Sequence, residues 1–116
     1  MKNEFSEELQ SFNREILIDA LERIKLNTTY LWSDLELAYE NKQTRIQSTI
    51  RKTTFTIIKN DLELLKSYDL LNYSCEYTGN LRNDFILKIT IEIHDNLFEL
   101  IKIIQERSRP LDVFSA

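Results

Sequence analysis

Glycine and proline are almost missing from this chain. Its 116 residues include one glycine, Gly79, and one proline, Pro110. P-loops and dinucleotide-binding fingerprints each need several glycines, because a Cβ would keep the backbone away from the phosphates. The composition therefore excludes these nucleotide-binding motifs. Because glycine and proline are also the main chain breakers, we expect long helices and strands with few tight turns.

Histidine and cysteine are equally scarce, with His94 and Cys75 as the single representatives. One of each cannot build a zinc site of the usual kind. We expect His94 to cap a helix at a strand-to-helix junction and Cys75 to be a small buried hydrophobic residue. A lone cysteine excludes an internal disulfide and fits a reducing compartment. The sequence thus predicts a protein without metal, cofactor or enzymatic activity.

Long hydrophobic runs are absent as well, since the longest span three residues, as in Ile16–Ile18. A membrane-spanning helix needs about 20 consecutive apolar residues. The acidic N-terminal sequence lacks the apolar stretch of a secretory signal. With 42% hydrophobic and 29% charged residues, the composition is that of a globular protein. We expect one cytoplasmic domain over residues 1–116 that does not contact membranes.

The residues that are present favour helices in the N-terminal part, residues 6–42. Apolar side chains recur every three to four positions over Ser6–Leu26, which predicts an amphipathic helix with Ser6 as its N-cap. A second helix is predicted over Asp34–Asn41, because Ser33 and Glu36 have the spacing of a capping box.

The C-terminal half alternates with a period of two. Apolar and polar residues alternate over Phe85–Ile93, which predicts a half-buried strand, and Tyr73–Tyr77 predicts an earlier one. The loop between them contains Gly79, so we expect a β-hairpin with a connection longer than the tightest kind. A helix over residues 95–107 and a tail over residues 108–116 follow. The predicted fold is α+β, mainly helical, with a C-terminal antiparallel hairpin and a terminal helix.

The segment from Asn41 to Lys66 fits two interpretations. Its many threonines and isoleucines have high β-propensity, which favours a strand. Its apolar residues also keep a helical spacing, and strict alternation fails over the segment as a whole. We favour a short helix over Thr44–Arg51, a turn, and a longer helix over Thr54–Tyr68. Residues 44–94 would then form a helix-turn-helix followed by the hairpin.

The end of this segment resembles a known family. The sequence IKNDLELLKSYDLL, Ile58–Leu71, is similar to the second half of a winged helix-turn-helix DNA-binding domain. In that family the recognition helix has an I-x-x-D-L-x-x-L spacing and ends at Gly-Leu-Leu before the first wing strand. The matching residues here are Ile58, Asp61, Leu62, Leu65, Leu70 and Leu71. Asp69 stands where glycine is usual, and Lys52 and Thr53 stand where the turn normally has a small residue. The resemblance implies a winged-helix-like fold that contacts DNA with this helix and the wing.

Charge is distributed unevenly along the chain. The formal net charge is −4, and residues 1–40 contain nine acids and four bases. Between Asn41 and Asn60 there are five bases and no acid. A local basic segment with interleaved hydroxyls is typical of a phosphate-binding face. The candidate nucleic-acid-binding residues are Arg45, Arg51, Lys52, Thr54, Thr56, Lys59 and, from the hairpin loop, Arg82.

Two functions remain open. The first is a small DNA-binding protein, such as a transcriptional, plasmid or phage regulator, that forms a homodimer through its first and last helices. The alternative is an acidic protein-interaction module, such as an immunity protein, inhibitor or chaperone, that covers a basic partner surface with its first helix. The structure of Arg45–Lys59 bears on the choice, because an exposed basic helix favours DNA and a paired strand favours the interaction module.

Overall fold

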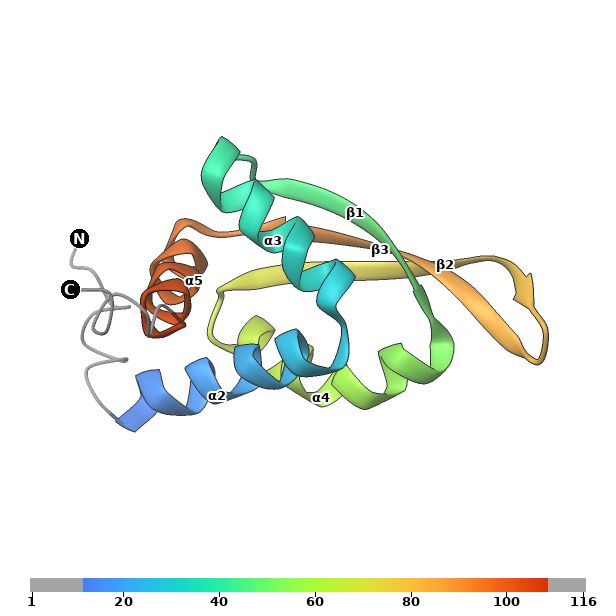
Figure 1. The fold of residues 1–116 in the computed structure, drawn as a ribbon, viewed down its shortest axis with the longest axis horizontal. Coiled ribbons are helices and arrows are strands. Elements are labelled where there is room, and N and C mark those ends of the chain that lie inside the picture. Colours follow the sequence, from blue (N-terminus) through green and yellow to red (C-terminus); the bar gives the residue numbers. More distant parts are fainter. Residues whose placement is uncertain (1–11, 109–116) are drawn as a thin grey trace.

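Four helices and three strands make up the described part of the chain, residues 12–108 of a computed structural model (Figure 1). The fold class is α+β, as predicted. The predicted N-cap Ser6 and the tail residues 109–116 lie outside the described residues. In chain order the elements are α2 Phe12–Asn27, α3 Thr29–Asn41, β1 Arg45–Arg51, α4 Lys52–Ser67, β2 Leu71–Leu81, β3 Asp84–Ile93 and α5 Asp95–Arg107.

The strands form one antiparallel sheet in the order β1-β3-β2, so β3 lies in the centre (Figure 1). The alternation predicted for Phe85–Ile93 is confirmed, because Ile89 and Ile91 are fully buried while Lys88 and Thr90 on the opposite face are half-buried. Helices cover the face of the sheet that carries the isoleucines. The other face carries mainly polar side chains, such as Gln47, Thr90 and Glu92, together with Ile86.

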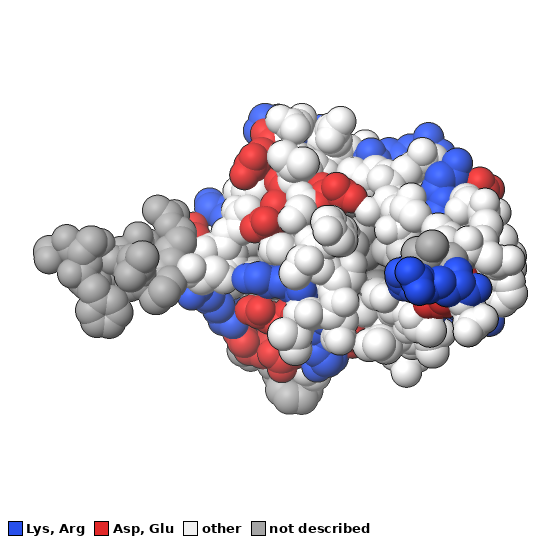
Figure 2. All heavy atoms as spheres, turned by 45° about the vertical axis from the view of Figure 1, so that its right-hand side comes forward, with Lys and Arg blue, Asp and Glu red and all other residues white. Residues whose placement is uncertain are grey.

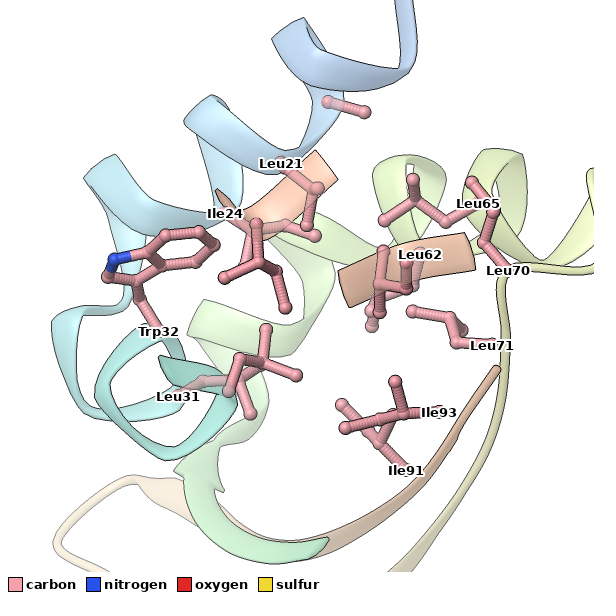
Figure 3. Packing of buried hydrophobic residues seen from close by; sticks show 14 of the residues in the cluster. Leu21, Ile24, Leu31, Trp32, Leu62, Leu65, Leu70, Leu71, Ile91 and Ile93 are labelled. Atoms are coloured by element: carbon pink, nitrogen blue, oxygen red, sulfur yellow. The ribbon is translucent and has the colours of Figure 1, made fainter. Parts of the chain in front are cut away.

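One hydrophobic core joins the helices to the sheet. The side chains in it are aliphatic except for Trp32, which is 4% exposed. They converge from α2, α3, α4, the start of β2 and the end of β3 (Figure 3). The residues labelled there are Leu21, Ile24, Leu31, Trp32, Leu62, Leu65, Leu70, Leu71, Ile91 and Ile93.

Helix α3 begins earlier than predicted. It starts at Thr29, and the hydroxyl of Thr28 accepts a hydrogen bond from the backbone N–H of Leu31 at 3.4 Å. Ser33 therefore lies inside the helix, and the predicted capping box with Glu36 is wrong. The threonine caps first because α2 ends at Asn27, which leaves one residue between the two helices.

The predicted helix over Thr44–Arg51 is wrong, because Arg45–Arg51 is strand β1 and pairs with β3 along its whole length. The alternation in this segment is real but stops at Arg51, where α4 begins. The longer helix predicted over Thr54–Tyr68 is confirmed as α4. Since α4 is the one helix between β1 and β2, the helix-turn-helix predicted over residues 44–68 is not formed.

The hairpin turn also differs from the prediction. Gly79 lies within β2, beside a register shift that follows Tyr77, and the turn consists of Arg82 and Asn83. Arg82 takes the left-handed conformation there, with φ of 58°. Asp69 is also left-handed, with φ of 60°, at the position where the winged-helix family has glycine.

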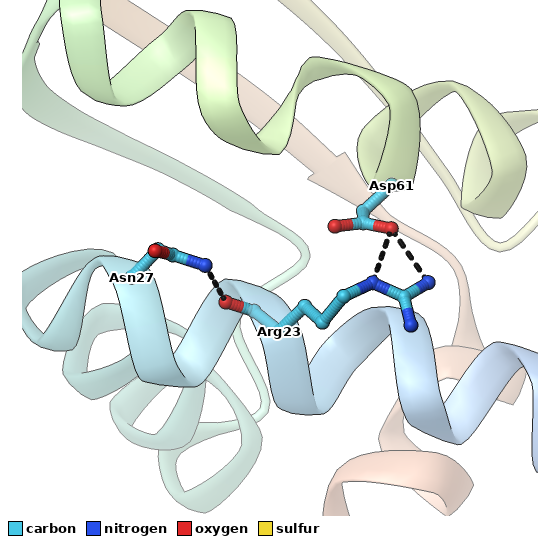
Figure 4. Close-up of polar contacts among 3 residues, drawn as sticks. All are labelled: Arg23, Asn27 and Asp61. Carbon is cyan, nitrogen blue, oxygen red and sulfur yellow. Dashed lines mark hydrogen bonds and ion pairs between the residues drawn. The ribbon is translucent and has the colours of Figure 1, made fainter.

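An ion pair fixes α2 against α4 (Figure 4). The guanidinium of Arg23 donates hydrogen bonds from Nε and Nη2 to one carboxylate oxygen of Asp61, at 3.0 and 2.8 Å. Asp61 is 9% exposed, and the hydrogen bond and charge of its carboxylate raise the pKa of Arg23. The aspartate of the winged-helix-like motif is thus bound inside the protein rather than free for a ligand.

The apolar face of α5 is buried against other parts of the same chain. Leu100, Ile101 and Ile104 are fully buried against the rest of the core, as are Leu17 and Leu21 of α2. Most described apolar side chains of these two helices are thus covered within the chain, although Leu26 of α2 is 80% exposed. A homodimer stays a prediction. None of the described helices has the length and apolar character needed to cross a membrane.

Candidate nucleic-acid interface

Three lysines follow one side of α4. Lys52, Lys59 and Lys66 are seven residues apart and exposed. Because seven residues make almost two full helical turns, the three side chains lie in one row, about 10 Å from one to the next. The row provides three positive charges on the surface of a protein whose net charge is negative.

The first and last members of this lysine row lie against the β2–β3 hairpin. The Nζ atom of Lys52 lies 5.8 Å from the ring centroid of Phe85, and that of Lys66 lies 5.7 Å from the ring centroid of Tyr73. Phe55, also on α4, packs against Tyr73 with ring centroids 6.1 Å apart. Such cation–π contacts at exposed sites are worth about 0.5–1 kcal/mol each, so they orient the ammonium groups without burying them.

The hairpin extends past the start of α4, and its inner face becomes progressively more exposed toward the turn (Figure 1). Along β2, Leu71 is buried, Tyr73 is half-buried, and Cys75 and Tyr77 are exposed. The prediction of a buried Cys75 is therefore wrong, because the helices cover this face only near the start of the strand. Partial burial still raises the pKa of the Cys75 thiol.

Tyr77 and Phe85 form an aromatic pair at the exposed end of the hairpin. Their ring centroids are 5.2 Å apart in an edge-to-face arrangement, and the side chains are 64% and 47% exposed. We call the surface made by the lysine row and this side of the hairpin the α4–hairpin surface. It comprises Lys52, Phe55, Lys59, Lys66, Tyr73, Cys75, Tyr77, Arg82 and Phe85.

The acids beside this surface are held in hydrogen bonds. The hydroxyl of Tyr73 donates to the carboxylate of Glu63, and burial together with this interaction raises the pKa of Tyr73. The hydroxyl of Thr53 donates to Asp84 at 2.7 Å, which ties the start of α4 to the hairpin. Figure 2 shows lysine and arginine atoms at both ends of the molecule, whereas most of the visible acidic atoms lie in the left half of the view.

The structure brings together part of the predicted site. Lys52, Thr56 and Lys59 lie along the same side of α4, and Thr56 donates its hydroxyl hydrogen to the backbone carbonyl of Lys52 at 3.0 Å. Arg82 occupies the hairpin turn and is exposed. Lys52, Lys59 and Arg82 thus belong to the α4–hairpin surface, and Thr56 lies beside the lysine row.

The remaining predicted residues lie elsewhere. Arg45 and Arg51 are at opposite ends of β1, about 20 Å apart, and their side chains belong to the open face of the sheet. Arg51 and Thr54 line a hollow of about 440 Å³ between β1 and the α2–α3 junction. Exposed Tyr30 separates it from a second hollow of about 510 Å³ that reaches Lys88. Neither hollow opens onto the lysine row.

Sequence reasoning missed Lys66 and the aromatic residues Tyr73, Tyr77 and Phe85. The seven-residue spacing of the lysines is visible in the sequence once α4 is accepted as a helix. The aromatic pair carried no such signal, because its two members meet only through the register of the hairpin, in which Tyr77 pairs with Leu87.

Comparisons with protein-family models, curated proteins and solved structures found no match for this chain. Among the described residues, no three His, Cys, Asp or Glu side chains are grouped as a metal site would require.

Proposed function

We propose that the protein binds DNA through the α4–hairpin surface. The observation that carries this proposal is the row of three lysines on α4 beside the exposed aromatic residues of the hairpin. Lysine ammonium groups are common donors to phosphate oxygens, and contacts of this kind position a protein on DNA without reading its sequence. Arg82 would contact the backbone from the hairpin turn.

The proposed role of α4 differs from that of the recognition helix in a winged-helix domain. In the winged-helix comparison α4 is the reading helix and the hairpin is the wing. Because β1 stands where the preceding helix was expected, we propose that the side of α4 facing the hairpin follows the phosphate backbone. The formal charge of −4 opposes the approach to DNA, so affinity would be modest and would depend strongly on salt.

The first prediction tests this proposal through the salt dependence of binding. Each phosphate contact that is removed reduces the slope of log K against log salt by about one unit. The double variant Lys52→Ala, Lys59→Ala should therefore flatten the slope by about two. We would measure it by fluorescence anisotropy with a labelled 20-base-pair duplex, and verify folding by circular dichroism.

The matched control is the double variant Lys42→Ala, Lys102→Ala, which removes the same charge from other exposed positions. It should leave the slope almost unchanged. Equal slopes for the two double variants would show that only diffuse charge acts. Failure to bind DNA at low salt, whether duplex or single-stranded, would refute DNA binding.

A second candidate function follows from the acidic residues on α2. Glu15, Asp19 and Glu22 lie along α2 with the spacing of one helix face. Arg107 binds Glu15 at 2.8 Å, and this hydrogen bond lowers the pKa of Glu15. An acidic face of this kind suits an immunity protein, inhibitor or chaperone that covers a basic partner.

The paired strand at Arg45–Arg51 also favours the interaction module, by the criterion stated above. Co-purification followed by mass analysis separates the two functions. A bound basic protein that is lost in Asp19→Lys, Glu22→Lys would favour the interaction module, whereas retained duplex binding in the same variant would favour DNA.

A further inference from the structure

The exposed pair of Tyr77 and Phe85 is not explained by phosphate contacts. By the register of the hairpin both residues belong to its inner face, and both are exposed. The hairpin extends beyond the start of α4 (Figure 1). Leu87 and Ile89, further along β3 on the same side, are buried in the core. The chain thus exposes two large aromatic rings to water, and on β3 the exposure changes within two residues, from Phe85 at 47% to Leu87 at 5%.

Positively charged residues lie near this aromatic pair in the structure. The Nζ atom of Lys52 lies 5.8 Å from the centroid of Phe85, and Arg82 stands in the turn between the two strands. Lys59 is the next member of the lysine row. A base stacked on either ring would therefore have its phosphate within reach of an ammonium or guanidinium group.

A duplex and a single strand use such a surface differently. In a duplex the bases are stacked on one another and present only their edges, so the ring faces of Tyr77 and Phe85 have no partner. In a single strand the bases are free to stack on aromatic side chains while a basic surface follows the backbone. The combination of exposed aromatic rings and basic side chains on one surface therefore suits a single strand better than a duplex.

We infer that the α4–hairpin surface binds single-stranded DNA, with bases stacked on Tyr77 and Phe85 and phosphates held by Lys52, Lys59 and Arg82. This inference rests on the proposed DNA binding and specifies its substrate. A partner protein of matching chemistry would need acidic groups around an apolar centre. A single strand supplies both parts in every nucleotide, which has one phosphate and one base that can stack.

The second prediction tests the inference with two labelled probes, a 15-nucleotide thymidine oligomer and a 15-base-pair duplex, by fluorescence anisotropy at the same salt. The unmodified protein should bind the single strand more tightly. Stacking is worth about 1–3 kcal/mol per base, so the double variant Tyr77→Leu, Phe85→Leu should weaken single-strand binding by at least about tenfold. Duplex binding should change less than about twofold, because it depends on the lysines.

Two further variants guard against a folding effect. Tyr77→Trp keeps an aromatic face and should retain or strengthen single-strand binding. Tyr30→Leu removes a tyrosine that is 81% exposed at the α2–α3 junction and should change neither affinity. Melting curves should show that every variant is fully folded at the temperature of the binding measurements.

The outcomes separate the inference from the function on which it rests. Duplex binding with equal or weaker single-strand binding, or single-strand binding that survives the double leucine variant, would overturn the inference and leave DNA binding intact. Failure to bind both probes at low salt would overturn DNA binding itself. Single-strand preference that is lost with the two rings supports the inference.

Discussion

At the scale of single residues, the contact between Arg23 and Asp61 is the polar interaction on which the packing of α2 against α4 most depends. Asp61 is 9% exposed, while the side chain of Arg23 is 53% exposed. The two partners are therefore unequal. Water can replace the carboxylate around Arg23, but it cannot easily replace the guanidinium beside Asp61.

The third prediction follows from this asymmetry. Arg23→Ala leaves a largely buried carboxylate without its donor, which costs about 1–3 kcal/mol. Thermal unfolding by circular dichroism should show a melting temperature lower by roughly 4–8 °C for each kcal/mol. Arg107→Ala, which breaks the exposed pair with Glu15, serves as control and should have little effect. Equal melting temperatures for the two variants would show that Asp61 is well solvated.

At the scale of secondary-structure elements, the scarcity of glycine affects how helices end. Helix α3 stops at Lys42, which is left-handed with φ of 57° and donates its backbone N–H to the last turn. Residues with a side chain pay about 1–2 kcal/mol in this conformation, whereas glycine does not. Lys42, Asp69 and Arg82 all have this strained conformation. The one glycine, Gly79, has no positive φ.

The fourth prediction is that Lys42→Gly stabilises the protein. Relief of the left-handed strain exceeds the greater entropy of glycine in the unfolded chain, so the free energy of unfolding should rise by about 0.5–1 kcal/mol. Urea unfolding measures the change. Lys42→Ala keeps a Cβ and should give no such gain. A loss of stability in Lys42→Gly would mean that the lysine side chain itself contributes to the helix end.

The sequence was sufficient for elements with one dominant period and insufficient for β1. The strand over Phe85–Ile93 alternates over its whole length, so its type and buried face could be predicted. Ile46 and Ile50 are four residues apart, a spacing that puts both on one face of a helix and also on one face of a strand. Their pairing with Ile91 and Leu87 of β3 decides between the two, and this pairing is distant in sequence.

The residues of the candidate site also differ in whether the sequence alone could place them. Lys52 and Lys59 could be assigned to one surface because their spacing on a helix is local information. Arg45 could not be separated from them without knowing that β1 is extended and carries it about 20 Å from Arg51. The pairing of Tyr77 with Phe85 depends on the hairpin register, which shifts by one residue near Gly79.

At the scale of the whole molecule, the sheet and the helices depend on one core. Ile104 of α5 and Ile89 of the central strand are both fully buried in it. A defect at either place should therefore affect all the elements together, which is the behaviour expected of a single cooperative unit.

The fifth prediction is that Ile104→Glu unfolds the chain. A charge without a partner at a fully buried position costs several kcal/mol, a large part of the roughly 5–15 kcal/mol that stabilises a domain. The far-ultraviolet helix signal and the near-ultraviolet signal of buried Trp32 should be lost together. Lys102→Glu, on the exposed side of α5, should keep both signals. A folded Ile104→Glu variant would show that α5 packs outside the core, as a dimer-forming helix would.

The position of β1 at the edge of the sheet bears on self-association. It pairs with β3 on one side only, so its other side presents backbone groups to which a strand of another molecule could add. Arg45 and Arg51 stand at its two ends. If two copies of β1 met in antiparallel register, Arg45 of each would face Arg51 of the other, and like charges opposite one another destabilise a strand pair. Repulsion between these arginines therefore disfavours pairing of β1 with β1 of another molecule. Added salt screens their charge and weakens this repulsion.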